Sequence, residues 1–117
     1  MTRINVAILP AELNTKMLIA EHREIKRIPN CIKKGRYSLK GQPADFTLGT
    51  GHVKFFYDKL TYLKRRYECI YAECVKRGYN VTYYGECFEN LPSALCNNYK
   101  PTLRDRKLLV ERIKSKL

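Results

Sequence analysis

Apolar residues recur at spacings of three and four along two long stretches of the chain, which is the period of an amphipathic helix. The first stretch covers residues 14–34, and the second covers residues 52–77. A shorter stretch with the same kind of pattern covers residues 103–116. The pattern therefore predicts three helices.

Polar residues suited to capping stand at the start of two of these stretches. Asn14 or Thr15 can serve as the N-cap of the first helix. Thr102 precedes the third helix, and Asp105 follows it at the spacing of a capping box. We expect both helices to begin at these residues.

Glycine and proline limit the predicted helices. Pro29 should kink the first helix or end its first segment, because proline lacks an N–H donor and its ring collides with the preceding turn. Gly35 should end that helix, and Gly78 should end the second. The remaining segments are predicted as an extended arm, residues 1–9, and as two irregular loops, residues 35–50 and 79–100.

The size of the chain fits one folding unit. It has 117 residues, of which 44% are hydrophobic, and this is enough for one small core. We expect a mainly α, compact single domain spanning residues 1–117. It should contain about three helices joined by long irregular loops.

The apolar rows of the helices indicate which faces are buried. In the third helix, Leu109 and Ile113 are the expected core contacts. The row of the second helix is Val53, Phe56, Leu60, Leu63, Tyr67, Ile70 and Cys74. The row of the first helix is Leu13, Met17, Ala20, Glu24 and Ile28. A carboxylate thus stands in an otherwise apolar row.

Glu24 also borders a row of basic residues, and two interpretations of it follow. The basic row is Lys16, Arg23, Arg27 and Lys34. In the first interpretation, Glu24 forms an ion pair with Arg27 or Lys16 on a solvated helix. In the second, the basic row follows a phosphate backbone. Glu24 is then a partly desolvated carboxylate and a candidate general acid or base.

The charge of the chain favours a polyanionic partner. It contains 23 Lys and Arg against 11 Asp and Glu, a net charge of +12. Nucleic acid and an anionic membrane surface both fit such an excess, as does a solvated basic surface without a partner. No apolar run approaches the roughly 20 residues that span a bilayer. The apolar stretch in the opening MTRINVAILP is too short for a signal peptide, so we expect a soluble protein of the cytoplasm.

The cysteines do not indicate a cross-linked or metal-bound protein. There are five, an odd number, and none forms a C-x-x-C pair. A disulfide framework or a zinc site is therefore not expected. We expect reduced cysteines packed in or near the core.

The start of the chain offers a candidate nucleophile. A small second residue such as Thr2 usually allows removal of the initiator Met1, which would leave Thr2 with a free α-amino group. The reference pKa of that group is about 7.7–8.0, against about 10.4 for lysine. A useful fraction is thus an unprotonated amine at neutral pH, and amines form Schiff bases with carbonyl-like carbons.

Four segments of the sequence resemble one known family. They are MTRIN at residues 1–5, AEHRE at 20–24, LGTGHVKFFYDKL at 48–60 and AECVKRG at 72–78. Together they resemble the pyrimidine-dimer DNA glycosylase/AP lyase family, the UV-repair "endonuclease V" enzymes of phages and some viruses and bacteria. The resemblance covers about residues 1–80, and the remainder is similar only loosely.

The resemblance implies a compact helical enzyme and a specific reaction. The N-terminal amine attacks the anomeric carbon of the 5′ sugar of a cyclobutane pyrimidine dimer, the glycosidic bond breaks, and an imine forms. β-Elimination then cuts the strand. By this resemblance Thr2 is the nucleophile and Glu24 the acid/base residue. Arginines that grip phosphates near the lesion correspond to Arg3, Arg23 and Arg27.

Other features of the expected function follow from the same resemblance and from the charge. Lys16, Lys34 and the basic residues of the third helix should add sequence-independent, salt-dependent attraction to DNA. The expected partner is double-stranded DNA containing pyrimidine dimers or abasic sites. No metal or other cofactor is required, and the enzyme is expected to be a monomer. Its expected place is the cytoplasm, or the host cytoplasm and nucleoid if the protein is viral.

Three departures from the family pattern bear on specificity. Met17 stands where members often have a histidine, and Lys26 stands where they usually have a proline. No aromatic residue follows Tyr99, whereas members tend to have an aromatic tail near the lesion. We expect that the preference for dimers is altered while imine chemistry is retained. For His52, a structural role at the junction of loop and helix is favoured over a catalytic one.

Two alternatives to this function stay open at the level of sequence. The first is an AP lyase, or a glycosylase for another damaged base, with weak specificity for dimers. The second is a basic DNA-binding module without catalysis. Borohydride trapping of a covalent adduct with DNA separates an enzyme from a binding module.

Overall fold

The structure is a computed structural model that describes residues 2–116, and it is built from helices and loops. The predicted mainly α fold is confirmed, because these residues contain no strand and only an isolated antiparallel bridge between Lys59 and Cys96. The main helices are α1 (Thr15–Glu24), α2 (Arg27–Lys33), α3 (His52–Phe55), α4 (Leu60–Lys76) and α5 (Leu103–Lys116). Three short 3₁₀ turns complete them: η1 (Pro10–Glu12), η2 (Gly85–Phe88) and η3 (Ser93–Leu95).

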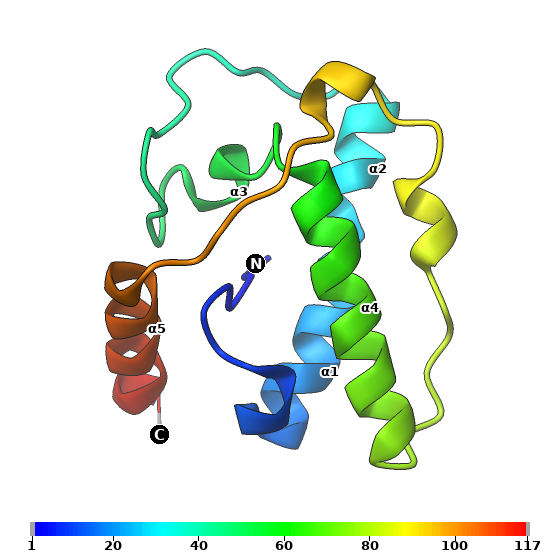
Figure 1. Ribbon diagram of the computed structural model, residues 1–117, viewed down its shortest axis with the longest axis vertical. Helices are drawn as coiled ribbons and strands as arrows, with labels where there is room; N and C mark the ends of the chain where they lie inside the picture. The colour runs from blue at the N-terminus through cyan, green and yellow to red at the C-terminus, as the bar shows by residue number, and fades with distance from the viewer. Residues whose placement is uncertain (1, 117) are drawn as a thin grey trace.

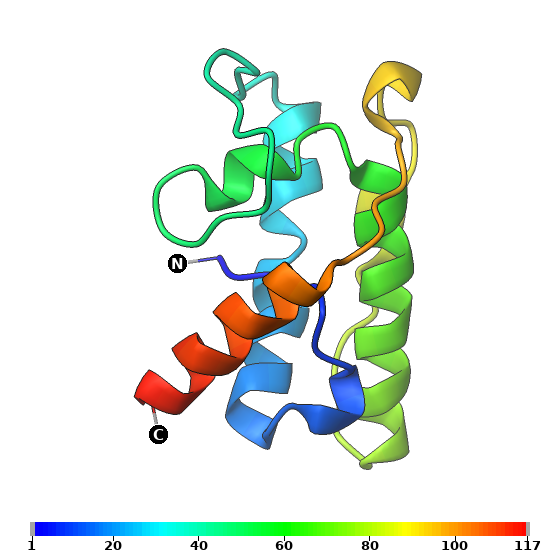
Figure 2. The ribbon, with the colours of Figure 1, turned by 60° about the vertical axis from the view of Figure 1, so that its left-hand side comes forward.

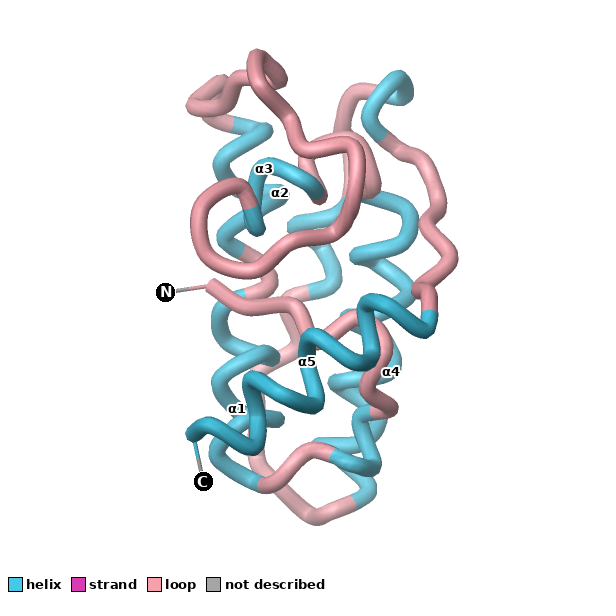
Figure 3. Tube along the Cα trace, turned by 90° about the vertical axis from the view of Figure 1, so that its left-hand side faces the viewer, coloured by secondary structure: helices cyan, strands magenta, loops and turns pink. Residues whose placement is uncertain are grey.

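The helices surround the N-terminal arm. Helix α4 runs alongside α1 and α2, and α5 lies on the other side of the arm (Figure 1). Turning the molecule shows that the first residues of the arm and α5 lie on the same side (Figures 2 and 3). No helix within residues 2–116 is long and apolar enough to cross a membrane.

The first predicted helix is two helices, and the break lies before Pro29 rather than at it. Helix α1 ends at Glu24, and α2 begins at Arg27. Pro29 has no N–H to donate to the carbonyl of Ile25, and its ring crowds that carbonyl, so the discontinuity falls one turn earlier in the chain. The expectation that Pro29 ends a first segment is confirmed, with its position corrected.

The second predicted helix is also divided. Helix α3 ends at Phe55, and a turn precedes α4, so the expectation of one helix over residues 52–77 is wrong. A side chain of the preceding loop bonds to the end of α3. The amide nitrogen of Gln42 donates to the carbonyls of Lys54 and Phe55 at 3.1 and 3.2 Å, and to Asp58 at 2.9 Å. These bonds satisfy carbonyls that an ending helix leaves unpaired.

The predicted helix starts are confirmed. The Asn14 side chain accepts a hydrogen bond from the Met17 N–H at 2.9 Å. The Thr102 N–H donates to Asp105 Oδ2 at 3.0 Å, and the Asp105 N–H donates to Thr102 Oγ1 at 3.1 Å. These reciprocal bonds form the expected capping box. Leu109, in the same helix α5, is fully buried.

The predicted helix ends are confirmed as well. Gly35 follows α2 with a φ of +68°, and Gly78 follows α4 with a φ of +81°. Glycine adopts this left-handed conformation without the steric cost that a Cβ would bring. All five cysteines are free thiols; Cys74 is buried, whereas Cys69 is exposed.

The buried face of α1 differs from the predicted one. The residues that face the core are Leu18, Glu21 and His22, followed by Ile25 beyond the helix. Of the predicted row, Leu13 and Ile28 are buried, whereas Met17, Ala20 and Glu24 are only half-buried, so the middle of that row is not a core face. The two rows are neighbours on the helix surface, and each contains one carboxylate. The row with Glu21 enters the core because α4 supplies a partner for that charge.

Glu21 and Arg66 form a buried ion pair. Their side chains are 1% and 6% exposed, and Arg66 Nε donates to Glu21 Oε2 at 2.7 Å. Arg66 Nη1 also donates to the Ile8 carbonyl at 2.6 Å, and the Asn5 side chain donates to Glu21 Oε1 at 2.7 Å. Buried charges are tolerated when they are paired and fully hydrogen-bonded in this way. The pair therefore joins the arm, α1 and α4.

Replacing either member of the pair should be costly. Glu21→Met or Arg66→Met leaves an unpaired charge in the core, and each should lower the free energy of unfolding by about 3–5 kcal/mol. The double variant leaves no unpaired charge, so it should lose clearly less than the sum of the two single variants. Urea denaturation followed by circular dichroism measures all three. Additive losses would contradict this account of the pair.

Candidate active site

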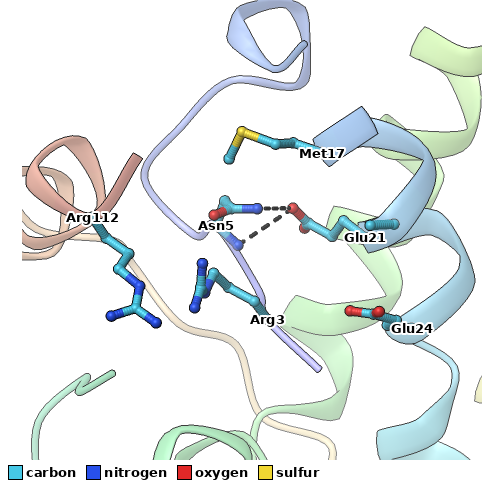
Figure 4. Close-up of a pocket in the computed structure, with 7 residues that line it drawn as sticks. Arg3, Asn5, Met17, Glu21, Glu24 and Arg112 are labelled. Carbon is cyan, nitrogen blue, oxygen red and sulfur yellow. Dashed lines mark hydrogen bonds between the residues drawn. The ribbon is translucent and has the colours of Figure 1, made fainter. Parts of the chain in front are cut away.

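A pocket of about 350 Å³ opens where the arm, α1 and α5 meet. Figure 4 shows side chains from the three segments pointing toward this space. The lining residues are Arg3 and Asn5 from the arm, Met17, Ala20, Glu21 and Glu24 from α1, and Arg112 from α5.

The geometry of α1 explains why its residues share the pocket wall. Met17, Ala20 and Glu24 are spaced by three and four, so they project from one face of the helix. Their row, which the sequence suggested as a core face, is therefore the wall of the pocket. Met17 and Ala20 make that wall apolar, and Glu24 gives it one carboxylate.

Glu24 is a largely enclosed carboxylate with a weak partner. Its side chain is 13% exposed, and its one ion pair among residues 2–116 is with Arg23 at 3.4 Å. The partners proposed for a solvated helix, Arg27 and Lys16, are not the ones observed. Because the Arg23 side chain is 59% exposed, solvent screens this pair strongly. Glu24 is thus partly desolvated, and its oxygens stay available to a ligand in the pocket.

Arg3 and Arg112 bring two positive charges to the same pocket. Figure 4 shows Arg3 between Arg112 and Glu24. Burial lowers the pKa of Arg3, as does the charge of Arg112, whereas Glu24 raises it. In the part of the chain that the structure describes, neither arginine has a salt bridge, and the buried Nε of Arg112 has no hydrogen-bond partner. Guanidinium groups without a salt-bridge partner are well suited to hydrogen-bonding an anion such as phosphate.

The other predicted DNA-contacting residues lie outside the pocket. Lys16, Arg23, Arg27 and Lys34 are all exposed. Thr2 is half-buried and directly precedes Arg3. Met1 lies outside the described residues, so the expected removal of Met1 concerns a part of the chain that the structure does not describe. The structure thus brings Arg3 and Glu24 together and leaves the basic row free to contact a large partner.

The sequence of this helical chain matches one protein family. The model of the family described as "Pyrimidine dimer DNA glycosylase" matches residues 1–84. The chain belongs to the pyrimidine dimer DNA glycosylase family. It is a DNA repair glycosylase, and damaged DNA is the substrate that the family implies.

The matched segment of this glycosylase contains most of the pocket. It includes the arm and α1 to α4, and hence every lining residue except Arg112. Arg112 comes from α5, beyond the match, and sequence reasoning counted it only among several basic residues of that helix. Its spacing of three from the buried Leu109 was the available signal, since that spacing places both on one side of the helix.

Glu21 and Arg66 were also missed in the sequence. Each stands in an otherwise apolar row, Glu21 between Leu18 and Ile25, and Arg66 between Leu63 and Ile70. Opposite charges in two apolar rows indicate a buried pair.

Within residues 2–116 no group of three or more His, Cys, Asp or Glu residues is gathered so as to hold a metal ion.

His52 lies beside the pocket and contacts the arm. Its ring is buried, Nε2 accepts a hydrogen bond from the Ile4 N–H at 2.9 Å, and Nδ1 lies 2.8 Å from the Thr47 carbonyl. Burial lowers the pKa of His52 most, and Arg3 lowers it further; the Thr47 carbonyl and Glu21 oppose this shift. A structural role at the junction of loop and helix was predicted for His52. In the structure its ring links the loop at Thr47 to the arm at Ile4.

His22 is a second histidine with a lowered pKa. It is buried in α1, and its Nε2 lies 3.1 Å from the Tyr67 hydroxyl. Burial is the main cause of the lowered pKa, and the charge of Lys26 adds to it. Lys26, which departs from the family pattern, lies over the ring of Tyr84 at 3.7 Å and so helps to hold the loop after α4.

The two histidines should make the stability of the fold depend on pH. The unfolded chain takes up protons near the ordinary histidine pKa of 6.5, whereas folded His22 and His52 take them up only at lower pH. The unfolded state therefore binds more protons in this window, and stability falls as the pH decreases from about 6.5 through the folded pKa values. Urea denaturation between pH 7.5 and 5 should show this loss. A His22→Gln/His52→Gln variant should show a flatter profile, and an equally steep one would contradict the assignment.

Proposed function

We propose that this glycosylase cleaves the glycosidic bond of the 5′ base of a cyclobutane pyrimidine dimer in double-stranded DNA and then nicks the strand through an imine. The observation that supports this proposal most is the meeting of Arg3, Glu24 and Arg112 in one pocket next to Thr2. The pocket offers an enclosed carboxylate and two guanidinium groups, which suit a sugar flanked by phosphates. All residues of the chain, 1–117, act in this proposal as one repair domain.

Thr2 is the nucleophile in the proposed reaction. Once Met1 is removed, Thr2 carries a free α-amine, a group whose reference pKa is about 7.7–8.0, against about 10.4 for a lysine side chain. The amine nitrogen attacks C1′ of the 5′ sugar, and the base leaves with the electrons of the glycosidic bond. The sugar ring then opens as its oxygen takes a proton, which leaves an imine between C1′ and the amine.

Glu24 moves protons at two steps of this sequence. It shuttles a proton to the ring oxygen while the imine forms. It then removes a hydrogen from C2′, and the resulting electron pair expels the 3′ phosphate. Enclosure in the pocket and a screened bond to Arg23 leave its carboxylate able to act as base and acid.

The arginines hold the DNA around the reacting sugar. Arg3 and Arg112 bind a phosphate next to the lesion, since both face the pocket without a salt-bridge partner among the described residues. Arg23 and Arg27 contact phosphates on either side. Lys16 and Lys34 extend this contact and add attraction that is independent of sequence and weakens with salt. In this proposal the enzyme acts as a monomer in the cytoplasm, with no metal or other cofactor.

One observation favours a second candidate function. Met17 lines the pocket with a thioether, at the position where the family often has a histidine. The pocket wall therefore lacks an ionisable group that members often have there. An AP lyase with weak preference for dimers fits this wall, because an abasic sugar needs the amine and the carboxylate but no recognition of a base.

Borohydride trapping of Glu24→Gln tests the proposed function. The wild-type chain with Met1 removed should become covalently linked to dimer-containing duplex DNA in the presence of borohydride. Glu24→Gln should cut the strand about 100-fold more slowly or worse, because it loses the acid/base group. Its affinity for the same DNA should be retained, since the phosphate contacts remain.

A matched control and the contrary outcomes complete this test. Glu89→Gln removes an exposed carboxylate outside the pocket and should leave cutting unchanged. Trapping of abasic DNA without trapping of dimer DNA would favour the second candidate function. No adduct with either DNA, after confirmed removal of Met1, would contradict enzymatic imine chemistry and leave a binding module.

A further inference from the structure

The arm is fixed at Ile4 by a histidine that does not line the pocket. The His52 ring lies at the start of α3, and its Nε2 accepts the Ile4 N–H at 2.9 Å. Nε2 can accept this bond only when it carries no proton, so Nδ1 carries the hydrogen and donates it to the Thr47 carbonyl at 2.8 Å. The ring thus links a loop carbonyl to the backbone of the arm in one tautomer.

The surroundings of the ring fix its plane and its charge. Phe46 and Phe56 both meet it edge to face, with ring centroids 5.4 Å away. The charged groups that face it are Arg3 from the arm and Glu21 from α1. Glu21 is already paired with Arg66, whereas Arg3 has no such partner among residues 2–116, so a second positive charge beside Arg3 is disfavoured. The ring is held as a neutral acceptor aimed at the arm.

Among the described residues, this is the hydrogen bond to the arm backbone that lies nearest in sequence to the proposed nucleophile. The next such bond along the arm is from the Asn5 N–H to Glu21 Oε1. Its length of 3.3 Å exceeds the 2.9 Å of the bond from Ile4 to His52. Ile4 is two residues from Thr2, a reach of at most about 7 Å. A displacement of the Ile4 nitrogen is therefore passed almost directly to the α-amine of Thr2.

We propose that His52 is a positioning residue that sets the place of the Thr2 α-amine through its hydrogen bond to the Ile4 N–H. This inference rests on the proposed function of Thr2 as the nucleophile. A misplacement of about 1 Å at a reacting centre can slow a reaction by roughly 100-fold. His52 then acts on the rate of imine formation and leaves the affinity for DNA, which depends on the arginines, unchanged.

Two substitutions separate the two bonds of the ring. The terminal oxygen of glutamine reaches the position of Nε2, so His52→Gln retains an acceptor for the Ile4 N–H and loses the donor to Thr47. The terminal amide of asparagine reaches only the position of Nδ1, so His52→Asn can retain the Thr47 bond and loses the acceptor for Ile4. Each variant is thus a control for the other.

The test measures single-turnover formation of the borohydride-trapped adduct on abasic duplex DNA, normalised to the folded fraction of each variant. His52→Gln should react within about threefold of wild type, and His52→Asn should react roughly 10- to 100-fold more slowly. The dissociation constant for a duplex with an uncleavable tetrahydrofuran site should change less than about twofold in both, since the phosphate contacts are intact. Hydrogen exchange of the Ile4 amide should be slow in wild type and in His52→Gln, and faster in His52→Asn.

Results that contradict the role of His52 differ from results that contradict the proposed function. Equal rates for the three proteins, the reverse order of the two variants, or an unprotected Ile4 amide in wild type would each overturn the role of His52. An equal loss of rate and of DNA affinity in both variants would also overturn it, because a general structural defect predicts that result. If wild type itself forms no adduct, the proposed function fails and the inference that rests on it fails too.

Discussion

The ion pair between Glu21 and Arg66 is the interaction on which the rest of the structure depends. The N-terminal arm belongs to no helix or sheet, so its buried N–H and C=O groups need partners from elsewhere. Side chains supply them, and the ion pair contributes the bonds at Asn5 and Ile8. The bonds to the arm backbone are His52 to Ile4, Glu21 to Asn5, Tyr62 to Val6, Arg106 to Ala7 and Arg66 to Ile8.

This arrangement gives the two carboxylates of α1 different tasks. Glu21 is buried, and Arg66 neutralises it, so it holds the arm in place. Glu24 lies one turn further along, at the pocket wall, where the exposed Arg23 is its one ion-pair partner among residues 2–116. The same helix thus anchors the arm and places beside it the carboxylate that we propose as the acid/base group. Side chains hold the backbone of the arm in place. This suits the proposed reaction, in which the terminal amine must be both fixed and accessible.

Local signals in the sequence predicted much of this fold, and distant contacts explain what they missed. The capping residues Asn14 and Thr102 and the terminal Gly35 and Gly78 act within one helical turn, so their effects could be predicted. Where the second helix divides, Gln42 bonds to the carbonyls at the end of α3, and no periodicity can reveal such a loop residue.

The candidate site was predictable to a similar degree. The choice between two rows on α1 depended on Arg66, which lies 45 residues away in the sequence. Glu24 and Arg3 do meet in one pocket, as their family positions suggested. A spacing of three from Leu109 indicated Arg112, but Arg106 has the same spacing, so only the packing of α5 shows that Arg112 is the one at the pocket. The residues proposed to carry the chemistry were thus easier to find than the residues that hold the arm in place.

The central claim is that the amine at the start of the arm forms the imine beside Glu24. The most direct measurement is peptide mapping by mass spectrometry of the borohydride-reduced adduct between the protein and dimer-containing DNA. The account predicts that the sugar remnant is attached to the α-amine of Thr2 and to no lysine side chain. Attachment to a lysine, such as Lys16 or Lys34 of the basic row, would contradict it.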